Sequence, residues 1–165
     1  MMNRLIVTMT LGATNALDNF KSPDNVDILV YSDDLDFPDK EYSEVFLVVT
    51  LGGQKLFNPD KIPSEERVVK WAEHYKQSNI PVTVIATTPF EFEGRHAQKA
   101  SQEQLSVINK IVDNTILIES QDILKNQGPS KFTILDCFYL LDDKIIQELY
   151  SLLKAPMSIF FEGKE

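Results

Sequence analysis

The sequence has little of the chemistry that builds disulfide or metal frameworks, with a single cysteine, Cys137, and two histidines, His74 and His96. One cysteine cannot form an internal disulfide, which fits a reducing compartment. These three residues are also too few for a zinc site of the usual ligand count. A chain of 165 residues needs neither device to bury a sizeable core. We therefore expect no disulfide and no metal site.

Long apolar runs and clustered positive charges are lacking as well. No segment approaches the roughly 18 consecutive apolar residues of a membrane-spanning helix, and the N-terminal stretch has no signal-peptide cleavage site. The 16 lysines and arginines stand against 25 acidic residues, giving a formal charge of −9. This balance argues against nucleic acid or an anionic membrane as the main partner. The sequence predicts an acidic, soluble, cytoplasmic protein with a single domain over residues 1–165.

Short β-rich runs alternate with segments of helical period along the chain. The runs are continuous in Val, Ile, Leu and Thr, which is typical of strands covered on both faces. They span residues 4–10, 26–32, 44–51, 80–87 and 115–119, and the helical segments span 64–78, 95–112 and 134–153. In the helix over 64–78, Glu65 and Glu66 are expected on the solvent side. The alternation predicts an α/β fold in three layers, a Rossmann-like, mostly parallel sheet with helices on both faces.

In such sheets ligands bind beyond the carboxyl ends of the strands, so the turns there are candidate sites. After the first strand, Gly12 leads into a short helix whose N–H groups can approach a phosphate. A tight turn with Thr14 as the helix cap explains the same residues. After the third strand, Gly52 and Gly53 suit either a phosphate cradle or a plain turn, and Lys55 is the nearby cation.

The turn after the fourth strand and the long helix supply the other candidates. Phe90 and Phe92 are expected to alternate into the core. Glu93, at the entry to the next helix, either caps N–H groups or accepts from a ligand hydroxyl. In the helix over 134–153, a planar base can stack on Phe138 while Asp142 accepts from its N–H groups. In the alternative, Phe138 belongs to the core and Asp142 is solvated.

Taken in order, these segments resemble FtsZ, the bacterial tubulin homologue. Residues 87–124, TTPFEFEGRHAQKASQEQLSVINKIVDNTILIESQDIL, resemble the family stretch T-K-P-F-x-F-E-G-x-x-R, a helix, and then V-D-x-x-I-x-I-x-N-D-x-L. Residues 134–143, ILDCFYLLDD, resemble the start of the family's central helix. Residues 12–16, GATNA, resemble the end of its first nucleotide loop, G-G-x-x-N-A, and residues 47–53 resemble the strand entering its phosphate loop.

The resemblance implies a nucleotide domain of the tubulin/FtsZ GTPase type, with GTP or GDP as its ligand. The nucleotide-binding positions that it implies are Gly12, Asn15, Gly52, Gly53, Glu93, Arg95, Phe138 and Asp142. The family arginine that follows the glutamate by four positions falls on Ala97, and Arg95 is the substitute two residues earlier. The family asparagine of I-x-N-D falls on Ser120 or Gln121, with Asp122 retained.

The departures from the family pattern imply a loss of catalysis. Of the phosphate loop G-G-G-T-G-T-G only Gly52 and Gly53 are kept, and bulkier residues follow over 54–57. The family motif N-x-D-x-x-D, whose aspartates polarise water onto the neighbouring subunit's GTP, corresponds roughly to residues 157–163, which contain no aspartate. The sequence then ends, so the family's C-terminal domain is expected to be absent. We expect no catalytic residues and no GTPase activity.

Three functions follow from these observations. The first is a non-catalytic interaction module or modulator of FtsZ-type assembly, connected with cell division, that contacts FtsZ or associates with itself. The second is a protein that binds GTP or GDP without hydrolysis. The third is a flavodoxin-like electron carrier, because residues 8–14, TMTLGAT, are similar to a T-x-T-G-x-T phosphate loop with one extra residue. The third leaves the 87–124 segment unexplained.

Overall fold

The computed structural model describes residues 2–53, 61–125 and 132–153. In this part of the chain, five parallel strands form one sheet in the order β2-β1-β3-β4-β5. The strands are β1 (Arg4–Thr8), β2 (Val26–Val30), β3 (Glu44–Thr50), β4 (Val82–Thr87) and β5 (Asn114–Ile118). The helices are α1 (Leu11–Ala16), α2 (Ser64–Lys76), α3 (Arg95–Ile111), α4 (Ser120–Lys125) and α5 (Ile134–Leu153), with a 3-10 turn η1 (Glu91–Glu93).

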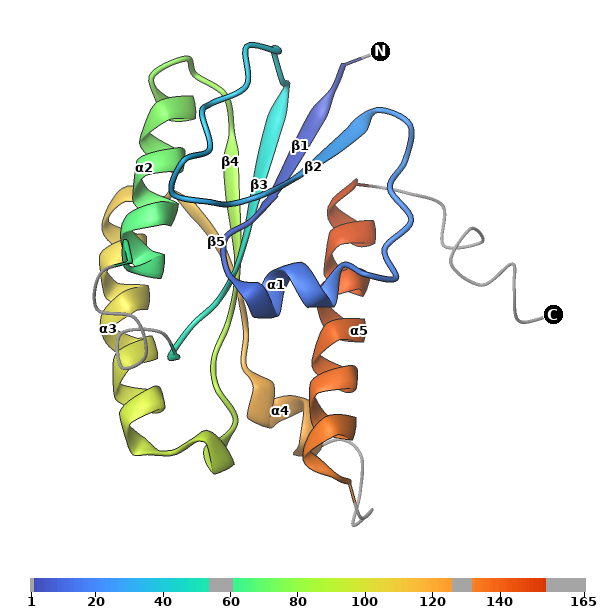
Figure 1. Cartoon of the computed structure of the whole chain (residues 1–165), viewed down its shortest axis with the longest axis vertical. Coiled ribbons are helices and arrows are strands. Elements are labelled where there is room, and N and C mark those ends of the chain that lie inside the picture. The colour runs from blue at the N-terminus through green and yellow to red at the C-terminus, as the bar shows by residue number, and fades with distance from the viewer. Residues whose placement is uncertain (1, 54–60, 126–131, 154–165) are drawn as a thin grey trace, which may run out of the picture.

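The elements form three layers, as the α/β pattern predicts. Figure 1 shows α2 and α3 on one side of the sheet and α1 and α5 on the other. The crossovers from β3 through α2 and from β4 through α3 join parallel neighbours in the sheet. The predicted fold class, a parallel sheet with helices on both faces, is therefore confirmed.

The central strands are buried on both faces, which explains why their apolar runs are continuous. In β3, Phe46 and Val48 belong to the core under α1 and α5, while Leu47 belongs to the core under α2 and α3. Trp71 of α2 and Ile145 of α5 fill these two cores and are almost fully buried. Truncation of such a side chain to alanine typically costs about 2–5 kcal/mol of stability.

The helix α5 begins at Ile134 because the preceding residues cap it. The Thr133 hydroxyl accepts the Asp136 N–H at 3.1 Å, and the Asp136 carboxylate accepts the Thr133 N–H at 3.0 Å. This reciprocal pair satisfies N–H groups that the first turn of a helix leaves free. Near its other end, α5 is hydrogen-bonded to the segment that follows α1. The Tyr150 hydroxyl accepts the Lys21 N–H at 3.0 Å and donates to the Lys21 carbonyl at 3.1 Å. Within the described residues, no helix is long and apolar enough to cross a membrane.

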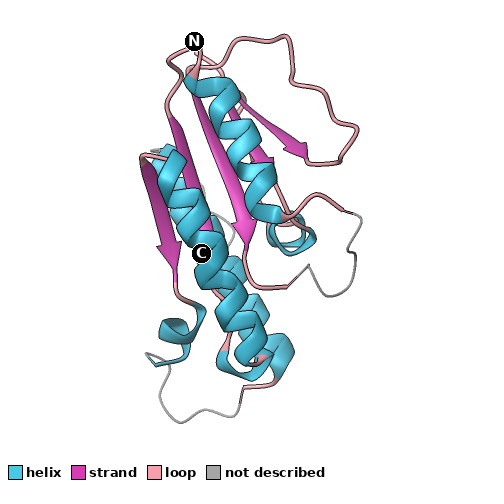
Figure 2. Cartoon of the chain, turned by 90° about the vertical axis from the view of Figure 1, so that its left-hand side faces the viewer, coloured by secondary structure: helices cyan, strands magenta, loops and turns pink. Residues whose placement is uncertain are grey.

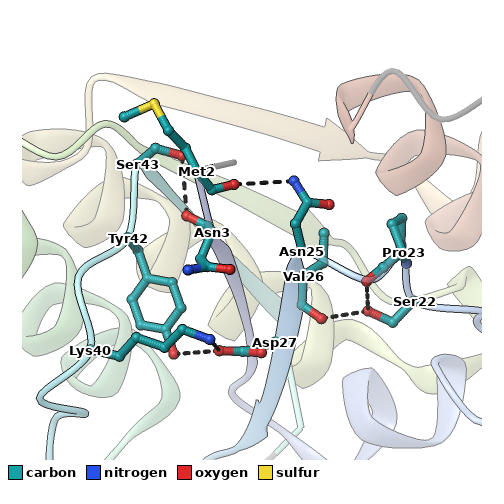
Figure 3. A network of polar contacts seen from close by, with 10 residues as sticks. All are labelled: Met2, Asn3, Ser22, Pro23, Asn25, Val26, Asp27, Lys40, Tyr42 and Ser43. Carbon is teal, nitrogen blue, oxygen red and sulfur yellow. Dashed lines mark hydrogen bonds and ion pairs between the residues drawn. The ribbon is translucent and has the colours of Figure 1, made fainter.

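The connection between β2 and β3 contains no helix and crosses the α2 side of the sheet as a loop. The Phe37 ring of this loop stacks on His74 of α2, with ring centroids 3.7 Å apart. The Asp27 carboxylate of β2 accepts from the Lys40 ammonium at 2.7 Å and from the Tyr42 hydroxyl at 2.9 Å (Figure 3). These polar contacts lower the pKa of Asp27 and attach the loop to the edge of the sheet.

Candidate functional site

The candidate site lies at the carboxyl ends of the strands, where β1 and β3 are neighbours. The chain leaves β1 for α1 on one face of the sheet and leaves β3 for α2 on the other. A crevice at such a reversal is the usual ligand position in open parallel sheets. Gly12, in the first turn of α1, and Gly52, in the turn after β3, therefore lie at the same end of the sheet.

The turn after β1 is held against the end of β3 by two threonine hydroxyls. The Thr10 and Thr50 hydroxyl oxygens are 2.6 Å apart, and the Thr50 N–H donates to the Thr10 hydroxyl at 3.0 Å. A methyl group on Gly12 would lie 2.8 Å from the Thr50 hydroxyl oxygen, so only glycine allows this close approach. Asn15 is exposed on α1. The prediction that Thr14 caps this helix is wrong. Thr10 is the N-cap of α1, and its hydroxyl accepts the Ala13 N–H at 3.4 Å.

The turn after β3 is shaped by Gly52, whose φ of +102° is costly for any residue with a side chain. Its N–H donates to the Gln104 side-chain oxygen at 2.8 Å, so this donor is already used by the protein. Gly53 is exposed, and nothing lies within 4 Å of where its side chain would begin. Lys55 and the bulky segment 54–57 lie outside the described residues.

Gln104 connects this turn to a carboxyl group inside the protein. Its side-chain amide donates to Glu65 at 3.1 Å, and both side chains are buried. The predicted solvent position of Glu65 is therefore wrong, because a buried hydrogen-bond partner from α3 outweighs the preference of a carboxylate for water. Two residues further along α2, the buried guanidinium of Arg67 donates to the carbonyls of Met9 and Ile62 at 2.8 Å each.

Glu93 and Arg95 flank the entry to α3. The Glu93 carboxylate accepts the Phe90 N–H at 2.6 Å, which makes it a cap of the η1 turn. Loss of hydration raises its pKa, and the hydrogen bond from Phe90 opposes this shift. Glu93 therefore caps η1 and not α3, whose start has no side-chain cap, and its contact with a ligand hydroxyl stays a prediction. Arg95 is exposed as the first residue of α3.

Phe138 belongs to an aromatic cluster at the same end of the sheet. Its ring lies edge-on to Phe90, with centroids 5.5 Å apart, and edge-on to Phe92 at 6.0 Å. Phe138 is half-buried against the core, so the core interpretation holds in part. The prediction that both Phe90 and Phe92 enter the core is wrong for Phe92. Phe90 is fully buried, whereas Phe92 is 46% exposed and stacks on Phe90 from outside.

Asp142 lies one helical turn further along α5 and is half-buried rather than solvated. Burial, together with the charges of Asp143 and Asp18, raises its pKa to about 6. Asp18 follows α1, so this carboxyl faces the first helix, which packs against α5. The positions that the resemblance assigns to phosphates, Gly12 and Gly52, thus follow β1 and β3, and those that it assigns to the base, Phe138 and Asp142, lie on α5.

The segment predicted to carry the family's I-x-N-D motif forms α4, which the sequence patterns did not indicate. The Ser120 hydroxyl is hydrogen-bonded to the Thr88 carbonyl, and the Gln121 side chain accepts the Glu91 N–H at 3.1 Å. Asp122 is exposed and forms an ion pair with Lys125 at 3.0 Å. Ser120 and Gln121 therefore form hydrogen bonds with the segment after β4, while Asp122 forms an ion pair with Lys125.

Sequence reasoning missed Gln104, Glu65 and Arg67. A signal for Gln104 was present, because Ala97, Gln104 and Ile108 lie at helical spacing on one stripe of α3. A polar residue on an apolar stripe indicates a buried hydrogen bond. Among the described residues, no group of three or more His, Cys, Asp or Glu side chains is arranged to hold a metal ion.

Comparisons with known proteins agree with this arrangement of the sheet. No family model matches the chain. The mitochondrial division protein fszB of Dictyostelium discoideum is 24% identical over 120 residues, which are 71% of this chain and 31% of that protein. An empty FtsZ dimer from M. jannaschii matches with a TM-score of 0.68 and 14% identity, over 93% of this chain and 55% of that chain. CetZ from Methanosaeta thermophila matches with a TM-score of 0.67 and 14% identity, over 94% and 55%.

This chain thus spans less than a third of the curated relative, 31%, and about half of the two solved chains, 55%. Its strand order alone also occurs in flavodoxin-type sheets. The superposition on FtsZ and CetZ, however, extends over nearly the whole chain. The resemblance seen in the sequence is confirmed at the level of the fold: this chain has the fold that the FtsZ and CetZ structures share.

Proposed function

We propose that this chain is a non-catalytic FtsZ-like interaction module that modulates FtsZ-type assembly, by contact with an FtsZ-type subunit or with copies of itself. One observation carries the proposal. The Gly52 N–H, at the end of β3, is bonded to Gln104, and Gln104 is bonded to the buried Glu65. The donor that the resemblance assigns to a phosphate is used inside the protein.

The electrostatics of this end support the same proposal. Backbone N–H groups at the start of a helix attract anions, and α2 starts beside the turn after β3. Glu65 and Glu66 both occupy the first turn of α2, so acidic groups of the chain itself stand at this position. Bound phosphates would have to be held next to them, in a protein with a formal charge of −9.

An interaction role draws on the printed descriptions of the similar proteins. The Dictyostelium relative is named as a mitochondrial division protein, and the M. jannaschii structure is that of an FtsZ dimer. Contacts between tubulin-like subunits use the surface of the domain, which a chain can keep after its nucleotide chemistry is lost. The module would therefore act through its shape and surface.

Sedimentation of the FtsZ-type protein of the same organism tests this proposal. Polymer is formed with GTP, and pelleted protein is measured with the chain in excess and with an unrelated acidic protein as the control. We expect the chain to change the amount of pelleted polymer and to release no phosphate from GTP when assayed alone. An unchanged pellet contradicts the interaction role, and steady phosphate release contradicts the non-catalytic one.

A second function, binding of GTP or GDP without hydrolysis, is favoured by the positions that the resemblance assigns to the base. Phe138 offers a half-buried aromatic ring, and Asp142 lies on the same helix one turn away, facing α1. Calorimetry with GTP and GDP in the presence of magnesium tests it. Binding in the micromolar range that Phe138→Ala and Asp142→Ala both weaken would support this function, whereas no binding at millimolar nucleotide would reject it.

A further inference from the structure

The strand β5 forms one edge of the sheet in the described part of the chain. Figure 2 shows it as the outermost strand on the left, running down into α4. The Ile118 carbonyl accepts the Thr88 N–H at 3.0 Å, so Ile118 directs its backbone groups inward. Because backbone groups alternate along a strand, Leu117 and Thr115 direct theirs to the open edge. An open edge of this kind is a template for one more strand.

A groove lies beside this edge, between the end of β5, α4 and the middle turns of α5. Its volume is about 510 Å³. Ile118, Ile123 and Leu140 give it an apolar lining from all three elements, and Leu117 at the edge is 38% exposed. An extended segment placed along β5 would therefore cover apolar surface while it pairs with the strand.

Acidic side chains surround this groove. They are Glu119 and Asp122 from α4 and its entry, and Asp143 and Glu148 from α5. Two of them have lysine partners nearby: Lys144 pairs with Glu148 at 3.1 Å and Lys125 pairs with Asp122 at 3.0 Å. Glu119 and Asp143 supply the surplus of negative charge, and both are exposed.

We propose that this groove binds an extended, basic peptide segment of a partner protein, which pairs with the open edge of β5 as a sixth strand and directs lysine or arginine side chains toward Glu119 and Asp143. Backbone pairing supplies the affinity in this mode of recognition, and side chains at alternate positions supply the specificity. The negative charge around the groove favours a basic partner over a second copy of this chain. A second copy of this chain, itself at −9, would bring further negative charge to an acidic rim, whereas a basic segment complements it.

The site is separate from the turns of Gly12 and Gly52, so it stands whether or not nucleotide binds. A fluorescently labelled acetyl-KVKVKVK-amide peptide is the probe, acetyl-EVEVEVE-amide is the control, and binding is followed by anisotropy. We expect the lysine peptide to bind, with an affinity that falls as salt rises, and the glutamate peptide to bind at least about tenfold more weakly. Equal binding of the two peptides, or no binding of the lysine peptide, overturns the proposal.

Two sets of variants locate the binding. Glu119→Lys with Asp143→Lys should weaken the lysine peptide by at least about tenfold. Asp34→Lys with Asp36→Lys changes the net charge equally at exposed positions in the β2–β3 loop and should change binding by less than about threefold. Equal loss in both double variants overturns the proposal, because it shows attraction by net charge alone.

Hydrogen exchange tests separately whether the peptide backbone pairs with β5. Amide hydrogen exchange should slow at Leu117 and Thr115 when the lysine peptide is bound, with little change at residues of β2. Leu117→Pro removes one outward N–H and is tolerated best at a strand edge, so it should weaken the peptide more than Leu117→Ala does. Unchanged exchange at Leu117 with the peptide bound overturns the added strand even if the proline variant fails to fold.

Discussion

The side-chain amide of Gln104 on α3 donates to the buried carboxyl of Glu65 on α2, 3.1 Å away. The same glutamine accepts the N–H of Gly52. One side chain thus joins two helices and a strand-end turn, and it forms hydrogen bonds with polar groups that burial has removed from water. Its removal should therefore be costly for the folded state.

Gln104→Ala should lower the free energy of unfolding by about 1–3 kcal/mol, because it removes two buried hydrogen bonds, one to the Gly52 N–H and one to the Glu65 carboxyl. Urea denaturation followed by the fluorescence of the buried Trp71 measures the loss. Gln102→Ala, at an exposed position of the same helix, is the control and should change stability by less than about 0.5 kcal/mol. Equal values for the two variants would contradict the role given to Gln104.

Gly52→Ala and Gly53→Ala should differ although they are neighbours. A methyl group at Gly52 would lie 2.8 Å from the Ala97 carbonyl oxygen, in a backbone conformation with φ of +102°, whereas at Gly53 it meets nothing within 4 Å. We expect Gly52→Ala to cost about 1–3 kcal/mol and Gly53→Ala to stay within about 0.5 kcal/mol of the parent. Thermal unfolding of the two variants is the measurement, and similar melting temperatures would refute the strained turn.

Asp142→Asn should change how stability depends on pH. The pKa of Asp142 is raised to about 6 in the folded protein from an ordinary value of 3.8, so folding favours the protonated form. Between these two pH values the folded state holds more protons than the unfolded state, and stability falls as pH rises. We expect the asparagine variant to gain about 1 kcal/mol relative to the parent from pH 4 to pH 7, since the group is half exposed and partly screened.

Urea titrations of both proteins at several pH values measure this difference, with the exposed Asp34→Asn as the control. A stability difference between parent and Asp142→Asn that is independent of pH would contradict a pKa raised by burial and by the charges of Asp143 and Asp18.

Phe138→Ala should destabilise the protein even without any ligand. The ring contacts Phe90 and Phe92 and is half-buried against the core. We expect a loss of about 2–4 kcal/mol, while truncation of the neighbouring Tyr139, 57% exposed, should cost less than about 1 kcal/mol. Chemical denaturation without nucleotide measures this loss, and unchanged stability of Phe138→Ala would contradict the packing role of the ring.

The features of the fold that depend on local sequence patterns were predicted from the sequence. The continuous apolar runs located all five strands within a few residues, because burial on both faces leaves no room for polar positions. The helix over 134–153 was predicted with the bounds that the structure shows, since its apolar residues recur every three or four positions and this period is a local signal. Residues 87–124 led to the correct fold, which the solved FtsZ and CetZ structures share.

What the sequence did not predict depends on contacts between distant residues. Glu65 was expected in water because its helix period permits it, and its burial requires Gln104, which is 39 residues away. The short helix α4 spans six residues, too few for a helical period to emerge. Phe92 was assigned to the core because it alternates with Phe90, but the 3-10 turn that holds it does not alternate as a strand does.

The pairing of Lys21 with Tyr150 has a consequence for the order in which the chain folds. One face of the first strand is covered by α1 and α5, so Ile6 on that face is buried only after α5, more than a hundred residues later in the chain, has been synthesised. Contacts between such distant segments make folding slow, because a large loop must close before they form. On the ribosome, the strands and the α2–α3 layer can assemble first, while the α5 side of the sheet stays open to chaperones until residue 153 has left the exit tunnel.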